Sequence, residues 1–167
     1  MRNFNYMRKI SNPWLHKEGY YCFGCAPTNP IGLHMEFFEE GDQIISFWRP
    51  QDHFQGWVGV LHGGIISTLI DETAGWVVTR KLQSAGMTAR LNVSFKKELL
   101  ASETQITIRA QLSQQRRQLA DIHVVVENAH GEVCAEGDAT YFVLNEEKSR
   151  EMGFEHCDVE GENLLPF

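Results

Sequence analysis

The sequence predicts an α+β fold in which one long helix packs against a curved antiparallel sheet. Between residues 63 and 83, apolar side chains recur with the helical period of about 3.6, and after residue 90 the period changes to two over four successive stretches. Upstream, two runs rich in β-forming residues flank Gly41-Asp42, which predicts a hairpin that joins the same sheet. Two strands, one helix and then four strands give a sheet wrapped around that helix.

The predicted elements follow one another with short connections. The hairpin strands cover residues 34–40 and 43–49, a glycine-containing loop covers 50–60, and the helix ends before Gly86. Alternating apolar and polar side chains predict strands over 91–95, 106–112, 122–126 and 133–143. The links at 113–117 and 128–131 are short, so the strands that they join are expected to be antiparallel neighbours.

A helical wheel separates two faces of the predicted helix. The face expected to meet the core comprises Ile65, Ile66, Leu69, Ile70, Thr73, Ala74 and Val77. The opposite face carries small residues and one acid, namely Gly64, Ser67, Thr68, Asp71, Gly75 and Val78. A solvated face would normally carry more Lys, Glu or Gln, so this stripe predicts the close approach of another chain or a ligand.

The helix begins with His62-Gly63-Gly64 and carries Asp71 nine residues after the histidine. Glycines at a helix start leave backbone N–H groups open to an anion or a polarised carbonyl. An ionised carboxylate on an otherwise apolar helix needs a partner or a task, although Asp71 and Glu72 are also compatible with ordinary surface acids. An anion-stabilising end and a base on one helix indicate acyl chemistry.

Composition and charge exclude several classes of protein. The chain has 167 residues, of which 43% are hydrophobic, and this fits one globular domain. The formal net charge of −7 argues against a general binder of nucleic acid or anionic membranes, because phosphate contacts need surplus Lys and Arg. Acids and hydroxyls interrupt the apolar run 63–78, and the first residues lack the apolar stretch of a signal peptide. No membrane partner and a cytoplasmic location are therefore expected.

Four cysteines stand at positions 22, 25, 134 and 157. The pair Cys22-x-x-Cys25 has no second pair at zinc-ligand spacing, so a metal site would need donors such as His16, His34 or Cys157 from elsewhere. Reduced cysteines packed in an N-terminal loop are expected, and no metal. A glycine-rich phosphate loop is missing from the sequence, so no nucleotide cofactor is expected.

Together these residues resemble the hotdog-fold acyl-CoA thioesterases of the PaaI-like group. The resemblance covers residues 22–144, from Cys22-x-x-Cys25 and Asn29-Pro30-Ile31-Gly32-Leu33, through Gln55-Gly56-Trp57 and His62-Gly63-Gly64, to the segment 88–95. It implies a hotdog domain over 22–144. The flanking residues are an N-terminal extension (1–21), whose aromatic side chains have no period, and an acidic C-terminal tail (145–167), and both are expected to be peripheral. The resemblance also implies protomers paired as a homodimer or a dimer of dimers.

The resemblance implies hydrolysis of an acyl-CoA thioester to a free acid and coenzyme A, without a cofactor. Asp71 is expected to activate water or to attack the carbonyl carbon, and Gly63 N–H to hold the thioester oxygen. His62 is expected to shape the turn, and Thr88 to orient the water beside the carboxylate. Gly63 and Asp71 lie about 12 Å apart along a helix axis, so they are expected to serve one site from different chains.

One position departs from the family pattern. Several relatives carry an Asn six residues before the histidine, where this chain has Gly56, and Gln55 is the neighbour that could supply an amide. The residues expected at the substrate are Gly64, Gly56, Trp57, Arg90, Arg116 and Arg117. The arginines are candidates for the coenzyme A phosphates, although solubilising surface charge also explains them.

Two other functions stay open at this point. A hotdog enoyl-thioester hydratase or dehydratase is suggested by Asp52-His53-Phe54, although Gln55-Gly56 replaces the Pro-Gly that follows in those enzymes. A non-catalytic acyl-CoA-binding protein is suggested by the glycine at position 56. Release of coenzyme A distinguishes hydrolysis from both.

Overall fold

The computed structural model describes residues 7–161 and arranges seven strands of this part of the chain in one antiparallel sheet. The sheet order is β1-β2-β3-β5-β6-β7-β4. The strands are β1 (Arg8–Lys9), β2 (Phe38–Glu40), β3 (Gln43–Trp48), β4 (Gly86–Phe95), β5 (Ile106–Arg116), β6 (Leu119–Glu127) and β7 (Val133–Val143). The helices are η1 (Asp52–Phe54), α1 (Gly63–Lys81) and α2 (Glu146–Glu151). The predicted α+β class is confirmed, and the predicted hairpin joins the sheet through β3 and β5.

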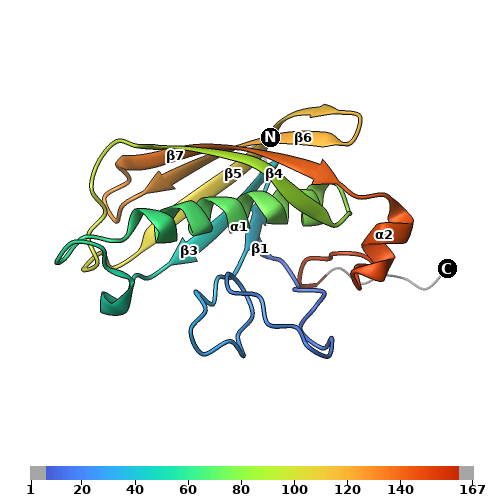
Figure 1. Ribbon diagram of the computed structural model, residues 1–167, viewed down its shortest axis with the longest axis horizontal. Coiled ribbons are helices and arrows are strands. Elements are labelled where there is room, and N and C mark those ends of the chain that lie inside the picture. The colour runs from blue at the N-terminus through green and yellow to red at the C-terminus, as the bar shows by residue number, and fades with distance from the viewer. Residues whose placement is uncertain (1–6, 162–167) are drawn as a thin grey trace.

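Helix α1 lies along one face of the sheet, and the N-terminal loops lie on the other side of the helix (Figure 1). Its buried side chains are Ile66, Leu69, Ile70, Thr73, Ala74, Trp76, Val77, Val78 and Thr79. The predicted core face is therefore largely confirmed, with Ile65 only partly buried. Val78 was placed on the opposite face, and this is wrong: its side chain packs against Gly86, where a Cβ would lie 3.0 Å from Val78 Cγ1.

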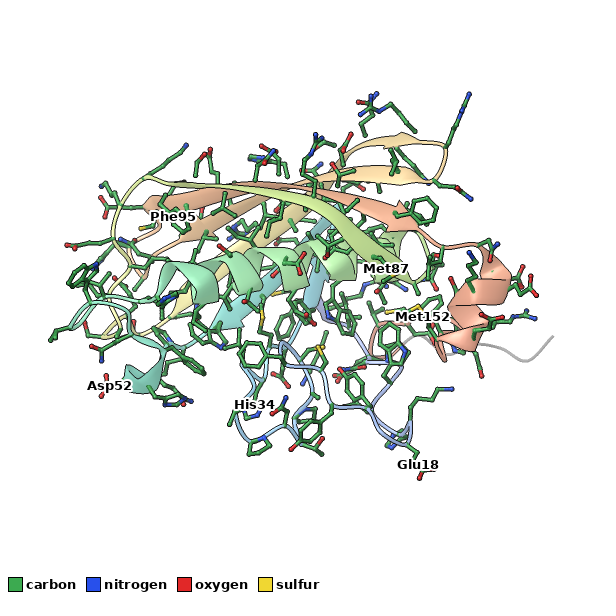
Figure 2. The ribbon with its side chains drawn as sticks, in the orientation of Figure 1. Glu18, His34, Asp52, Met87, Phe95 and Met152 are labelled. Atoms are coloured by element: carbon green, nitrogen blue, oxygen red, sulfur yellow. The ribbon has the colours of Figure 1, made fainter. Side chains whose placement is uncertain are left out.

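Strand β4 ends the sheet order and pairs with β7 over its whole length. It begins at Gly86, five residues before the predicted start. In Figure 2, the labelled residues Met87 and Phe95 lie near its two ends. Its partner is β7 and not β5, the next strand in sequence. Within residues 7–161 no strand pairs with the outer edge of β4.

Two other predicted strands have different limits. β2 begins at Phe38 and not at residue 34, and His34 at the predicted start has a positive φ of 52°, which a strand does not contain. β5 continues to Arg116, so the link to β6 is the tight turn Arg117–Gln118, in which Arg117 has a φ of 54°. The β5–β6 hairpin is thus longer than the alternation predicts, and both links that were expected to join antiparallel neighbours do so.

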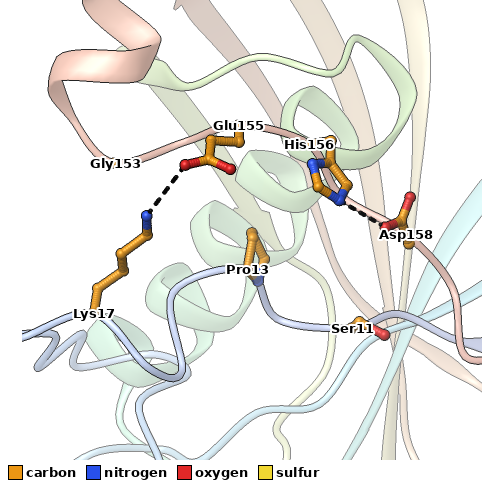
Figure 3. A pocket seen from close by; sticks show the side chains of 7 residues that line it. All are labelled: Ser11, Pro13, Lys17, Gly153, Glu155, His156 and Asp158. Atoms are coloured by element: carbon orange, nitrogen blue, oxygen red, sulfur yellow. Dashed lines mark ion pairs between the residues drawn. The ribbon is translucent and has the colours of Figure 1, made fainter. Parts of the chain in front are cut away.

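Within the described residues, the terminal segments 7–21 and 145–161 pack together against the core. Ile10 pairs with Val159 as an antiparallel bridge, and both side chains are buried. Lys17 and Glu155 form an ion pair at 3.8 Å across a small hollow between the segments (Figure 3). These segments therefore contribute to the packed structure, whereas the sequence pattern suggested peripheral ends. The domain boundaries at 22 and 144 stay predictions.

Glu39 on β2 is a buried acid that anchors the end of α1. Its carboxylate accepts hydrogen bonds from Arg80 Nε and Lys81 Nζ, both at 2.8 Å, and from Arg8 at 2.7 Å. Burial by itself raises the pKa of Glu39, but hydrogen bonds from Arg80 and Lys81 and their charges lower it to about 2.

Among the described helices, none is long and apolar enough to cross a membrane.

Candidate active site

The start of α1 is shaped by His62. The imidazole Nδ1 accepts a hydrogen bond from Gly64 N–H at 2.9 Å, so this side chain caps the helix. The cap uses the Gly64 donor, whereas Gly63 N–H has no acceptor among residues 7–161. The ring of Phe95 lies beside Gly63, where a Cβ would meet Phe95 Cζ at 3.4 Å. One backbone donor is therefore available at the positive end of the helix.

Asp71 is held by two hydroxyl groups from neighbouring strands. Thr88 Oγ1 and Tyr141 OH each donate to Asp71 Oδ1 at 2.8 Å, and Tyr141 OH also donates to the Asp71 carbonyl oxygen at 2.7 Å. Burial and the charge of Asp71 raise the pKa of Tyr141, so its phenol remains a donor. Both hydroxyls use the same carboxylate oxygen. No residue within 7–161 donates to Oδ2, which leaves that oxygen for water.

A bulge in β4 brings the two hydroxyls together. Thr88 pairs directly with Tyr141, and the register then shifts so that Arg90 pairs with Thr140 and Leu91 with Ala139. Directly opposite residues share one face of a sheet, so Thr88, Tyr141 and Leu91 all face α1. Ala89 is the extra residue of this bulge. Without it, Thr88 and Leu91 would point to opposite faces.

A cavity of about 450 Å³ adjoins the carboxylate. At one end it is lined by Asp71, Thr88 and Tyr141. The rest of its wall combines aromatic and sulfur-containing side chains, among them Trp14, Tyr20, Cys22, Cys25, Trp76 and Met152. A concave, mostly apolar cavity with a few convergent polar groups is the usual form of a small-molecule site. The terminal segments thus build part of the wall of the candidate site.

The cysteine pair lies in this wall beside Glu72. Cys22 Sγ is 3.5 Å from Glu72 Oε1, and Cys25 Sγ is 2.9 Å from Tyr20 OH. The hydrogen bond between the two thiols lowers the pKa of Cys22 and, together with burial, raises that of Cys25. No disulfide joins any of the four cysteines, all of which lie within residues 7–161.

The loop before α1 holds the next group of predicted residues. Gln55 Oε1 accepts a hydrogen bond from Gly59 N–H at 2.5 Å, so its oxygen closes this loop and is not aimed at Asp71. At Gly56 a Cβ would lie 3.2 Å from His62 Cδ2, so packing against the cap explains the glycine. Trp57 is 85% exposed at the tip of the loop. Trp57 does not line the cavity beside Asp71, so its contact with substrate stays a prediction.

The three predicted arginines do not gather at Asp71. Arg90 lies opposite Thr140 on the outer face of the sheet and contacts its hydroxyl at 3.4 Å. Arg116 donates to Asp121 at 2.9 Å, and Arg117 occupies the turn of the β5–β6 hairpin. Their roles toward coenzyme A stay predictions.

Sequence reasoning missed three members of the site. Tyr141 is one of the alternating apolar residues of the predicted strand 133–143. A buried tyrosine hydroxyl needs a hydrogen-bond partner, and this was the available signal. Glu72 was grouped with surface acids, and Trp14 lies in a segment without periodicity. Only the folded chain places Glu72 and Trp14 in one cavity with Asp71.

Comparison with known proteins agrees with this architecture. Residues 58–135 match the model of the thioesterase superfamily. The acyl-coenzyme A thioesterase THEM4 of Mus musculus is 37% identical over 57 residues, and that of Rattus norvegicus is 36% identical over 64 residues. These matches cover 34% and 38% of this chain, but only 24% and 27% of the relatives. The matched part thus spans about a quarter of the length of these curated proteins.

Solved structures show the same fold. A thioesterase protein of Streptococcus pneumoniae, crystallised with coenzyme A, gives a TM-score of 0.62 at 23% identity over 66% of this chain and 86% of its own. The Escherichia coli PaaI protein gives 0.61 at 15% identity over 68% and 81%. The predicted hotdog fold is therefore confirmed.

Proposed function

We propose that this chain hydrolyses an acyl-coenzyme A thioester to a free acid and coenzyme A, and the match of residues 58–135 to the thioesterase superfamily model supports this. One observation supports the proposal most strongly. The Asp71 carboxylate is fixed at one oxygen by Thr88 and Tyr141, receives no hydrogen bond at its second oxygen from residues 7–161, and borders a cavity that can take an acyl group.

Asp71 acts in one of two ways. As a general base it accepts a proton from water, whose oxygen attacks the carbonyl carbon. As a nucleophile it attacks that carbon itself and forms an anhydride, which water then opens. In both cases the carbon–sulfur bond breaks and coenzyme A leaves as the thiol. Thr88 lies where it can also accept a hydrogen bond from the water, and Tyr141 is a positioning residue because it acts through the carboxylate.

The oxyanion donor in this proposal is Gly63 N–H of a neighbouring subunit. Eight residues separate Gly63 from Asp71, and at about 1.5 Å per residue they lie roughly 12 Å apart along the axis of α1. The reacting atoms must lie within about 3–3.5 Å of the groups that act on them. A two-fold axis that places two α1 helices antiparallel brings the start of one beside Asp71 of the other. The outer edge of β4 and exposed Trp57 leave surface for such a partner.

The coenzyme A end of the substrate is proposed to meet Arg90, Arg116 and Arg117. Arg90 and Arg116 lie on the sheet face away from Asp71, so we infer that they contact coenzyme A bound to a neighbouring chain. A homo-oligomer in the cytoplasm is part of the same proposal.

Conversion of Asp71 to Asn tests the assignment. In a single-turnover reaction with a short acyl-coenzyme A, the wild type is expected to release free thiol, and the Asp71→Asn variant to release none. Asp138→Asn, on the outer face of the sheet, is the matched control and should keep full activity. Hydration of the acyl chain without thiol release, or binding without any reaction, would replace hydrolysis by one of the two alternatives.

A further inference from the structure

Three potential metal ligands converge on the cavity wall from two separate parts of the chain. Cys22 and Cys25 come from the N-terminal loop, and Glu72 comes from α1. One donor atom from each lies within 4.8 Å of the other two, and this is the sole group of this kind among the described residues. Cys22 Sγ lies 3.5 Å and 3.7 Å from the two carboxylate oxygens of Glu72.

The surroundings hold these donors in place. A Cβ at Gly24 would overlap the carboxyl carbon of Glu72, so the loop reaches the helix this closely because position 24 is glycine. Tyr20 OH lies 2.9 Å from Cys25 Sγ, and Trp76 Nε1 donates to Glu72 Oε1 at 3.2 Å. Such outer contacts orient ligands in metal sites.

We propose that Cys22, Cys25 and Glu72 bind one Zn²⁺ ion. Zinc prefers four ligands in a tetrahedron, with Zn–S near 2.3 Å and Zn–O near 2.0–2.2 Å, so its ligand atoms lie roughly 3.5–3.8 Å apart. The Cys22–Glu72 distances fit this range, and two cysteines separated by two residues are a common half of a zinc site. All three residues line the cavity, so water from the cavity supplies the fourth ligand.

The sequence pattern gave the opposite expectation because a third donor was sought among histidines and cysteines. His34 is instead engaged with the Asn29 carbonyl oxygen, and Cys157 lies near Ser11 and Gln83. Glu72 supplies the third donor. The bound ion would join the N-terminal loop to α1 at the residue after Asp71 and so brace the cavity wall.

Metal content is the direct test and does not depend on catalysis. The full chain is purified with a reducing agent and without chelators, and zinc is measured by elemental analysis. One zinc per chain is expected. Glu72→Gln should weaken zinc affinity at least about tenfold in competition with a chromophoric chelator, the scale seen when metal sites are perturbed. Glu136→Gln, a matched change on the outer face, should leave the affinity within about twofold.

Cobalt substitution of the wild type adds a measurement that needs no variant. Co²⁺ bound by two thiolates should give an intense sulfur-to-cobalt charge-transfer band, lost in Cys22→Ser and kept in Cys134→Ser. The proposal is wrong if reduced wild type binds no zinc on titration, if its cobalt form lacks this band, or if Glu72→Gln binds zinc as tightly as Glu136→Gln.

Discussion

Tyr141→Phe is the most informative single change at the proposed site because it removes one hydroxyl and keeps the ring. That hydroxyl donates to Asp71 Oδ1 at 2.8 Å and to the Asp71 carbonyl oxygen at 2.7 Å, and the side chain is only 5% exposed. The variant therefore loosens the carboxylate and leaves one backbone carbonyl without its side-chain donor. It should affect catalysis more than folding.

The expected size of the loss in activity follows from the hydrogen bonds that Tyr141 makes to Asp71. A hydrogen bond to a charged group contributes about 1.5–3 kcal/mol, and we take the lower end because Thr88 still holds Oδ1. About 1.4 kcal/mol in the barrier lowers kcat about tenfold. A loss of about 1 kcal/mol in folding free energy lowers Tm by about 2–4 °C in a chain of this size.

Steady-state hydrolysis of a short acyl-coenzyme A, followed by thiol release, measures this effect. We expect kcat to fall about tenfold while KM changes less than about threefold, since Tyr141 acts through Asp71. Thr88→Val should give a similar loss, and the double variant should be non-additive because both hydroxyls serve the same oxygen. Tyr21→Phe is the control, because Tyr21 is 58% exposed. A folded Tyr141→Phe protein with kcat within twofold of the wild type would refute the positioning role.

Two further changes examine the fold and the cavity. The pKa of Glu39 is lowered from 4.5 to about 2, so its ion pairs stabilise the fold fully above about pH 4.5 and lose this contribution as pH falls toward 2. Glu39→Gln should therefore lower the free energy of unfolding by on the order of 2–3 kcal/mol at pH 7. The Tm values of variant and wild type should converge near pH 2, and a Tm difference that does not change with pH would contradict the assignment. Met152→Trp adds bulk at the cavity wall and should lower kcat/KM for long acyl chains more than for acetyl-coenzyme A; an equal loss for both substrates would mean that the acyl chain binds elsewhere.

Much of the fold could be predicted because its elements have strong periods. Regularly spaced apolar residues set the buried face of the helix, with a period of 3.6. A period of two does the same in the hairpin and in strands β5, β6 and β7. Strand β4 shows the limit of this reasoning. Alternation through Leu91 and Val93 would send Ala89, and not Thr88, toward the helix, and the bulge that reverses this depends on pairing with β7.

The site could be predicted in part for the same reason. Asp71 was identified by its place on an apolar helix, which is a local property. Tyr141, Glu72 and the terminal wall of the cavity depend on contacts between distant segments, and no spacing along the chain encodes them.

Subunit complementation tests the central claim, that each site combines Asp71 of one chain with Gly63 N–H of another. Gly63→Pro removes the N–H at the first helical position, where proline is tolerated, and His62 already has the extended backbone (φ −65°, ψ 133°) that a residue before proline adopts. Gly63→Ala is the control, since its Cβ would make ordinary contact with Phe95 and the N–H remains.

Asp71→Asn and Gly63→Pro proteins are mixed in equal amounts and their subunits allowed to exchange. Each parent should be inactive, and Gly63→Ala should be active. Half of the randomly exchanged dimers are mixed and each has one intact site of two, so about a quarter of wild-type activity should return. If both variants fold and exchange but no activity returns, the shared site is contradicted.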